Sequence, residues 1–121
     1  LQAKDLDGTL TYVGIQAMMD PPRTAVAGAI QSCFDAGVAV KMITGDHAAT
    51  ATAIARQLGM IQGSATAVTG SVLAQTNDDD LLEVAECNAV FARVTPEQKL
   101  RMVRALQRRG HVVAMTGDGV N

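Results

Sequence analysis

The residues best suited to chemistry lie in short segments that combine glycine, threonine, aspartate and basic side chains. Thr44-Gly45-Asp46 and Thr116-Gly117-Asp118 repeat one tripeptide, and Arg93 and Lys99 lie between them. Small residues let a ligand approach the backbone amides, a threonine hydroxyl can donate to a phosphate oxygen, and a carboxylate can hold Mg²⁺. Together these segments indicate phosphoryl chemistry.

A less specific explanation exists for each segment. The aspartate of a single Thr-Gly-Asp turn can simply cap the next helix, although two copies after expected strands weaken that explanation. The ammonium group of Lys99 can equally lie on a solvated helix face together with the basic residues that follow it, which are Arg101, Arg104, Arg108 and Arg109. The spacing of these residues alone leaves both explanations open.

The composition limits the class of protein. With 121 residues, 48% of them hydrophobic, the chain has the size and apolar content of one folded domain. Its longest apolar run, residues 25–30, is far shorter than a membrane-spanning helix requires. A net charge of −2 and three aromatic residues argue against a nucleic-acid-binding surface. Two cysteines without a CxxC pattern suit an intracellular chain with reduced thiols.

The elements that must position the candidate residues alternate between strand-like and helix-like runs, a pattern typical of a parallel α/β sheet. We expect strands at 38–43, 89–94 and 112–115, a weak edge strand near 67–68 within a surface excursion over 60–77, and an extended segment over 10–18. We expect helices at 24–36 and 47–58, a helix after the acidic turn 77–80, and a helix from Pro96 to Arg109.

The start of the last helix has a clear local signal. Thr95-Pro96-Glu97-Gln98 combines a threonine N-cap, proline at the first helical position and glutamine three residues after the cap, which predicts a capping box. Loops at the carboxyl ends of parallel strands gather at one edge of the sheet. We therefore expect the candidate residues that follow strands to lie together at that edge.

Four blocks of sequence carry a resemblance to a known family. They are Asp20 to Arg23, Lys41 to His47, Phe91 to Lys99 and Met115 to Asn121. In this order they resemble the phosphorylation domain of a P-type cation-transporting ATPase, in the branch of the calcium and sodium pumps. The resemblance implies a haloacid-dehalogenase-like α/β fold: three layers, with a mostly parallel, Rossmann-like sheet between helices, here incomplete.

The same resemblance implies a function and a set of site residues. The parent would be an ATP-driven cation pump that uses Mg²⁺ and forms and hydrolyses an aspartyl phosphate. By match to the family, the catalytic residues are Thr44, Gly45, Asp46, Lys99 and Asp118, and Asp118 also binds the metal. The nucleotide or phosphate contacts are Arg23, Arg93 and Asn121, and the hinge is Asp20, Pro21 and Pro22.

The resemblance also implies a place for the chain in a longer protein. Residues 1–19 would return from the nucleotide-binding domain, 20–23 would form the hinge, and 24–121 would be a partial phosphorylation domain. The family's nucleophile motif, Asp-Lys-Thr-Gly-Thr, is absent from the sequence. We therefore expect a catalytically silent piece of a cytoplasmic domain of an integral membrane protein. It would lack the nucleotide-binding, actuator and transmembrane domains, stay soluble, and self-associate through exposed strand edges.

Two alternatives remain open. Asp5-Leu6-Asp7-Gly8-Thr9 matches the nucleophile motif of the wider superfamily, which would make the chain a small soluble Mg²⁺-dependent phosphatase with Asp5 as nucleophile and Asp7 as acid and base. Such a nucleophile should follow a buried strand, whereas residues 1–4 are short and polar. The second alternative is a non-catalytic module that binds phosphate or nucleotide.

Overall fold

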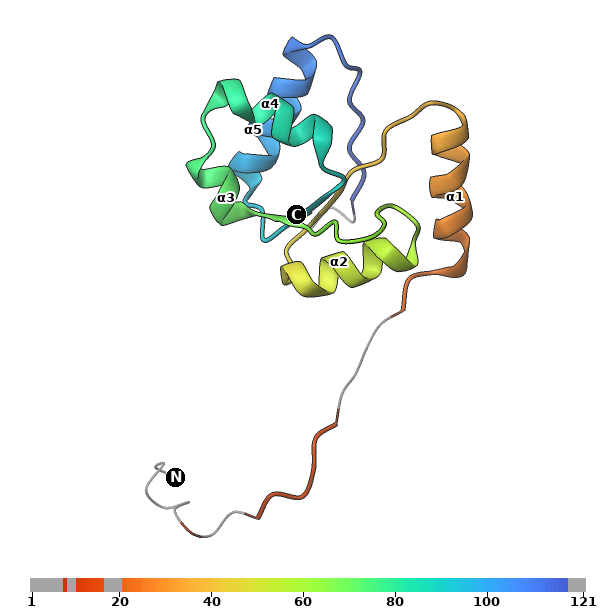
Figure 1. The fold of residues 1–121 in the computed structure, drawn as a ribbon, viewed down its shortest axis with the longest axis vertical. Helices are drawn as coiled ribbons and strands as arrows, with labels where there is room; N and C mark the ends of the chain where they lie inside the picture. Colours follow the sequence, from red (N-terminus) through yellow and green to blue (C-terminus); the bar gives the residue numbers. More distant parts are fainter. Residues whose placement is uncertain (1–7, 9–10, 17–20, 118–121) are drawn as a thin grey trace.

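The computed structural model describes residues 8, 11–16 and 21–117, and within them the chain alternates helices with short strands (Figure 1). The elements are α1 (Thr24–Asp35), β1 (Met42–Thr44), α2 (Ala48–Gln57), β2 (Val68–Thr69), α3 (Gly70–Gln75), α4 (Asp78–Cys87), β3 (Val90–Ala92) and α5 (Pro96–Arg108). The expected α/β class is confirmed.

The three strands form one parallel sheet in the order β1-β3-β2. Thr44 of β1 and Thr69 of β2 both pair with Ala92 of β3, so all three strands end at the same level. The expected edge strand is confirmed as β2. This register brings the loops that follow the strands to a single edge of the sheet.

The central strand β3 divides the core into two clusters because successive side chains of a strand point to opposite faces. Phe91, with no exposed surface, packs on one face with residues of α3, α4 and α5. Val90 and Ala92 pack on the other face with Ala51 and Ala55 of α2. Figure 1 shows α2 on one side of the sheet and α4 and α5 on the other. The expected three-layer arrangement is confirmed.

Local signals explain where several helices begin and end. The predicted capping box at α5 is confirmed: Thr95 Oγ1 accepts from Gln98 N at 3.3 Å, and Gln98 Oε1 accepts from Thr95 N at 3.0 Å. The helix after the acidic turn is α4, and Asn77 caps it by accepting from Asp80 N at 2.8 Å. Gly37, with φ +74°, follows the end of α1, as glycine commonly does at this position.

The stretch over residues 60–77 is more ordered than expected, because it contains helix α3. Thr69 caps α3 by accepting from Val72 N at 3.4 Å, and Leu73 is fully buried in the cluster around Phe91. The six residues of α3 are too few to show a helical period in the sequence. The burial of Leu73, a tertiary contact, stabilises this helix.

The strand expected at residues 112–115 is wrong. Residues 111–117 have no regular secondary structure, and the side chain of Val112 is fully exposed. A strand requires a neighbour for its hydrogen bonds, and no described strand pairs with this segment. Two other expected strands are shorter than predicted: the one at 38–43 begins only at Met42, and the one at 89–94 is β3, Val90–Ala92. Of the extended segment expected over 10–18, residues 11–16 are described, and they are exposed without regular secondary structure.

Candidate functional site

The candidate site lies where the three strands end. Because Thr44 pairs with Ala92, the Thr44-Gly45-Asp46 loop lies next to Arg93, the residue that follows β3. The structure thus brings together two of the segments that the sequence analysis singled out. In the third segment, Thr116 and Gly117 are exposed and irregular.

The Thr44-Gly45-Asp46 loop is held by two hydrogen bonds of its own. Thr44 Oγ1 donates to Asp46 Oδ2 at 2.9 Å and accepts from Asp46 N at 3.1 Å. The N-cap position of α2 belongs to His47, and no side chain caps the helix there. The explanation that Asp46 merely caps α2 is therefore wrong. The first amides of α2 lack a side-chain acceptor, an arrangement that favours an anion.

Arg93 has an unusual backbone conformation. Its φ is +53°, and among the described residues no other non-glycine residue has a positive φ. Its Nη2 atom forms a hydrogen bond with Nε2 of His47. A guanidinium has no acceptor, so His47 Nε2 must accept, which places the imidazole proton on Nδ1. Arg93 therefore extends from the end of β3 across to the start of α2.

Lys99 lies one turn into α5, the helix that begins soon after Arg93. Its side chain is half-buried, and no hydrogen bond or ion pair of this ammonium group is found within residues 21–117. Lys99 and Arg93 are thus two cationic groups supplied by the loop and first turn that follow β3. Neither has a carboxylate partner among the described residues.

No described contact places the other predicted site residues at this edge of the sheet. Arg23 is exposed at the N-cap position of α1, and its side chain makes no capping hydrogen bond. Pro21 and Pro22 precede α1 without regular secondary structure. The remaining predicted residues lie outside the described ranges; they are Asp5, Asp7, Asp20, Asp118 and Asn121.

The described residues do not by themselves form a metal site. Within residues 8, 11–16 and 21–117, no group of three or more His, Cys, Asp or Glu side chains could hold a metal ion. The Thr44-Gly45-Asp46 loop supplies one carboxylate, whereas Mg²⁺ takes an octahedral shell of oxygen ligands. The described part of the site thus provides at most part of such a shell.

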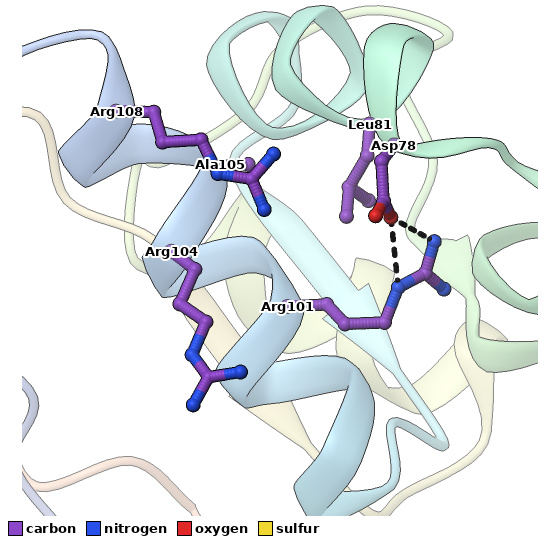
Figure 2. Close-up of a pocket in the computed structure, with 6 residues that line it drawn as sticks. All are labelled: Asp78, Leu81, Arg101, Arg104, Ala105 and Arg108. Carbon is purple, nitrogen blue, oxygen red and sulfur yellow. Dashed lines mark hydrogen bonds and ion pairs between the residues drawn. The ribbon is translucent and has the colours of Figure 1, made fainter.

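A separate charged cleft lies between α4 and α5 (Figure 2). It has a volume of about 140 Å³ and is lined by Asp78, Leu81, Arg101, Arg104, Ala105 and Arg108. The nearest of its arginines, Arg101, lies six residues after the N-cap Thr95. At the rise of an α-helix, that is about 9 Å along α5 from the edge where the strands end.

Arg101 is engaged entirely by protein acceptors. It donates to Asp78 Oδ1 from Nη2 at 2.7 Å and from Nε at 3.1 Å, the two contacts marked in Figure 2. It also donates to the carbonyls of Leu73 at 3.3 Å and Thr76 at 3.0 Å. The hydrogen bond and charge of Arg101 lower the pKa of Asp78. This cleft joins α3, α4 and α5 and has a structural role.

A third charged cluster closes the end of α4. Lys41 Nζ donates to the carbonyls of Glu86 at 2.7 Å and Asn88 at 2.9 Å, and burial lowers the pKa of this ammonium group. His111 Nε2 lies 2.8 Å from Glu86 Oε1, and this hydrogen bond lowers the pKa of Glu86. A cation at a helix C-terminus stabilises the last carbonyls. This cluster therefore connects the segments before β1 and after α5 to α4.

The sequence pattern of the haloacid dehalogenase-like hydrolases matches residues 10–121. The chain belongs to this family. The fold that the resemblance implied is thereby confirmed for this haloacid dehalogenase-like domain. None of its described helices combines the length and the apolar character needed to cross a membrane.

The relatives of this haloacid dehalogenase-like chain include ion-transporting ATPases. It is 57% identical over 120 residues to the probable cation-transporting ATPase F of Mycobacterium tuberculosis, covering 96% of this chain. It is 51% identical over 118 residues to a cation-transporting ATPase of Synechocystis, covering 97% of this chain. It is 48% identical over 112 residues to a calcium-transporting ATPase of Bacillus subtilis, covering 93% of this chain. The resemblance to cation-transporting ATPases is confirmed, and the chain spans 13% of each relative's length.

Three functional candidates were missed by sequence reasoning or assigned another role. His47 entered the sequence analysis only as the last residue of a matched block, and the structure adds its hydrogen bond to Arg93, which crosses from one strand end to another. Gly70 lies against the Arg93 carbonyl, and Gln98 donates to the carbonyl of Gly70 and accepts from Thr95 N in the loop after β3. Contacts of this kind depend on the sheet register, which no local pattern reveals. The motif Thr-Gly at 69–70, after the weak strand, was the one available signal.

Proposed function

We propose that this chain is part of the phosphorylation domain of an ATP-driven cation pump that forms and hydrolyses an aspartyl phosphate. The observation that carries the proposal is the shared strand edge, where the Thr44-Gly45-Asp46 loop, the guanidinium of Arg93 and the uncapped start of α2 adjoin. The guanidinium of Arg93 and the uncapped amides at the start of α2 can bind an anion, and the carboxylate of Asp46 can hold a cation such as Mg²⁺. The cation- and calcium-transporting ATPases among the relatives support the same assignment.

The chemistry follows from where charge develops. In phosphoryl transfer, negative charge is spread over three equatorial oxygens, so positioned cations and hydrogen-bond donors supply most of the catalysis. Lys99 is proposed to neutralise charge on the transferring group, and Thr44, Gly45 and Asp46 are proposed to contact that group or ATP. Arg93 is proposed to hold the nucleotide.

The remaining predicted site residues keep their proposed roles; of these, Asp20, Asp118 and Asn121 lie outside the described ranges. Asp118 is proposed as a ligand of Mg²⁺, whose charge would offset that of the phosphates. Arg23 and Asn121 are proposed to touch nucleotide or phosphate. Asp20, Pro21 and Pro22 are proposed as a hinge between a nucleotide-binding domain preceding 1–19 and the partial domain 24–121. The transported ion is proposed to be a cation, with Ca²⁺ as the first to test.

The proposal is tested in a full-length pump that carries this sequence. The protein is incubated with Mg²⁺ and ATP labelled at the γ-phosphate, quenched in acid, and analysed by mass spectrometry for a hydroxylamine-sensitive aspartyl phosphate. We expect the phosphate on an aspartate outside these 121 residues. Absence of any such adduct in protein shown to be folded would overturn the proposal.

The isolated chain distinguishes the alternatives. It is incubated with Mg²⁺ and acetyl phosphate or beryllium fluoride, alongside an Asp5→Asn control and a phosphatase assay. We expect neither adduct nor turnover. A Mg²⁺-dependent adduct at Asp5 that is lost in the control would instead establish a phosphatase. Saturable nucleotide binding by the chain, together with a full-length protein that never becomes phosphorylated, would establish a non-catalytic binding module.

The isolated chain is also proposed to self-associate. In the described sheet, β1 pairs only with β3, so its outer edge presents unpaired backbone groups that favour pairing with another chain. Light scattering over a range of concentrations should show a mass that rises with concentration. A concentration-independent monomer with a sharp cooperative melt would contradict this proposal.

A further inference from the structure

Gly70, the first residue of α3, has an environment that no other described glycine shares. A Cβ atom built at Gly70 would lie 2.1 Å from the Arg93 carbonyl oxygen and 2.9 Å from Gln98 Oε1. At every other described glycine, the Cβ position has nothing within 4 Å. Gly70 is also buried. The carbonyl of Arg93 therefore occupies the space that a side chain at position 70 would need.

Gln98 joins the same two segments by hydrogen bonds. Its Nε2 atom donates to the carbonyl of Gly70 at 2.7 Å, and its Oε1 atom accepts from Thr95 N at 3.0 Å. One amide thus connects the start of α3 to the loop between β3 and α5. The donor bond is additional to the capping box, which needs only the acceptor oxygen of the side chain.

The loop held in this way contains a backbone conformation that arginine rarely adopts. At φ +53°, Arg93 lies in the left-handed region, which is unfavourable for a residue with a side chain and persists where the surroundings fix it. From this backbone its guanidinium reaches His47 at the start of α2. A change of the backbone at Arg93 would therefore redirect the guanidinium.

We infer that Gly70 and Gln98 are positioning residues for Arg93. The empty side-chain position of Gly70 admits the Arg93 carbonyl, and the amide of Gln98 fixes Gly70 against it. Together they keep the guanidinium at the strand edge, where an anionic nucleotide would bind. The identity of that ligand rests on the proposed function; the steric relation between Gly70 and Arg93 does not.

A double-mutant cycle in the full-length pump tests the inference. The affinity for a non-hydrolysable ATP analogue is measured for the wild type, Gly70→Ala, Arg93→Ala and the double variant. Loss of a hydrogen bond to a charged group predicts an affinity about tenfold lower for each single variant. If Gly70 acts through Arg93, the double variant binds no more weakly than Arg93→Ala alone. Multiplication of the two effects would overturn the inference.

Gln98→Glu provides a second cycle in case Gly70→Ala fails to fold. Glutamate retains the acceptor of the capping box but cannot donate to the Gly70 carbonyl. We expect weaker binding in the wild-type background and little further loss in the Arg93→Ala background. A loss of equal size in both backgrounds would show that the added negative charge repels the nucleotide directly, which would overturn the role of Gln98.

Two controls separate positioning from general stability. Gly28→Ala, in a helix with open space around it, should leave the affinity unchanged. Leu81→Ala, in the core on α4, should lower the melting temperature with no change in affinity. A wild-type pump that does not bind the analogue would refute the proposed function. A wild type that binds, with an Arg93→Ala variant of equal affinity, would refute both the nucleotide contact proposed for Arg93 and the positioning inference that depends on it, while the assignment to a pump would stand.

Discussion

The cleft between α4 and α5 and the edge where the strands end both contain arginine, but only the arginine in the cleft has a carboxylate partner among the described residues. In the cleft, Arg101 donates to the carboxylate of Asp78 and to two backbone carbonyls. At the strand edge, the side chain of Arg93 bonds the neutral form of an imidazole. Lys99 has no described carboxylate partner.

The difference gives a physical criterion that separates a structural charge in this chain from a charge that we propose to be functional. A cation that is matched by protein acceptors has no remaining capacity for a ligand and stabilises the packing of helices. Arg93 and Lys99 have no carboxylate partner among the described residues, and they follow the strand that ends beside Thr44 and the uncapped start of α2. Such cations can still bind an anionic ligand, but they contribute less to the stability of the fold. The two regions therefore differ in the hydrogen-bond partners of their basic side chains and not in the type of residue.

The largest expected effect concerns the strand edge. Lys99→Ala in the full-length pump should lower kcat by about 10²–10³-fold, the loss typical when one preorganised donor to transition-state charge is removed. Stability should change by less than about 0.5 kcal/mol, as for most half-exposed helix positions. Rates of ATP hydrolysis and thermal melts measure the two quantities. Arg104→Ala, on the same helix, is the matched control; equal losses in both variants would remove the distinction between the regions.

An intermediate effect is expected in the cleft. Arg101→Ala leaves the carbonyls of Leu73 and Thr76 without this donor, which should cost about 1–3 kcal/mol of unfolding free energy. Nucleotide affinity should not change, because the cleft has a structural role. Urea denaturation of the chain and a binding assay on the pump provide the measurements. Weaker nucleotide binding without a loss of stability would assign the cleft to the functional site.

The smallest effect is a dependence of stability on pH. Arg101 lowers the pKa of Asp78, so the folded state favours the ionised carboxylate. This contribution is complete above the ordinary aspartate pKa of about 4 and is lost as the pH falls through the lowered folded value, because the unfolded chain takes up the proton first. Asp78→Asn should remove that part of the acid destabilisation, measured by urea denaturation from pH 5 downward. An unchanged slope would mean that Glu86 and Glu97, whose pKa values are also lowered, account for it.

Sequence reasoning succeeded where the signal is local. The capping box at Thr95 and Gln98 involves groups three residues apart, and the strand-end position of Thr44 follows from the alternation of elements. It failed where stability comes from distant contacts. The helix α3 depends on burial of Leu73, and the segment 112–115 lacks a strand to pair with among the described residues. The sequence also did not reveal that Arg93 contacts His47 and Gly70, because both residues are distant from it along the chain.

The register of β3 has a consequence for the fidelity of folding. A shift of one residue along its neighbours would turn Phe91 toward α2 and turn Val90 and Ala92 toward α4 and α5, because strand side chains alternate between faces. The same shift would move Arg93 away from the level of Thr44. Misregistered chains would therefore lose the core and the alignment of Arg93 with Thr44 together. A cell that degrades chains with exposed apolar side chains would thereby also remove those in which Arg93 no longer adjoins Thr44.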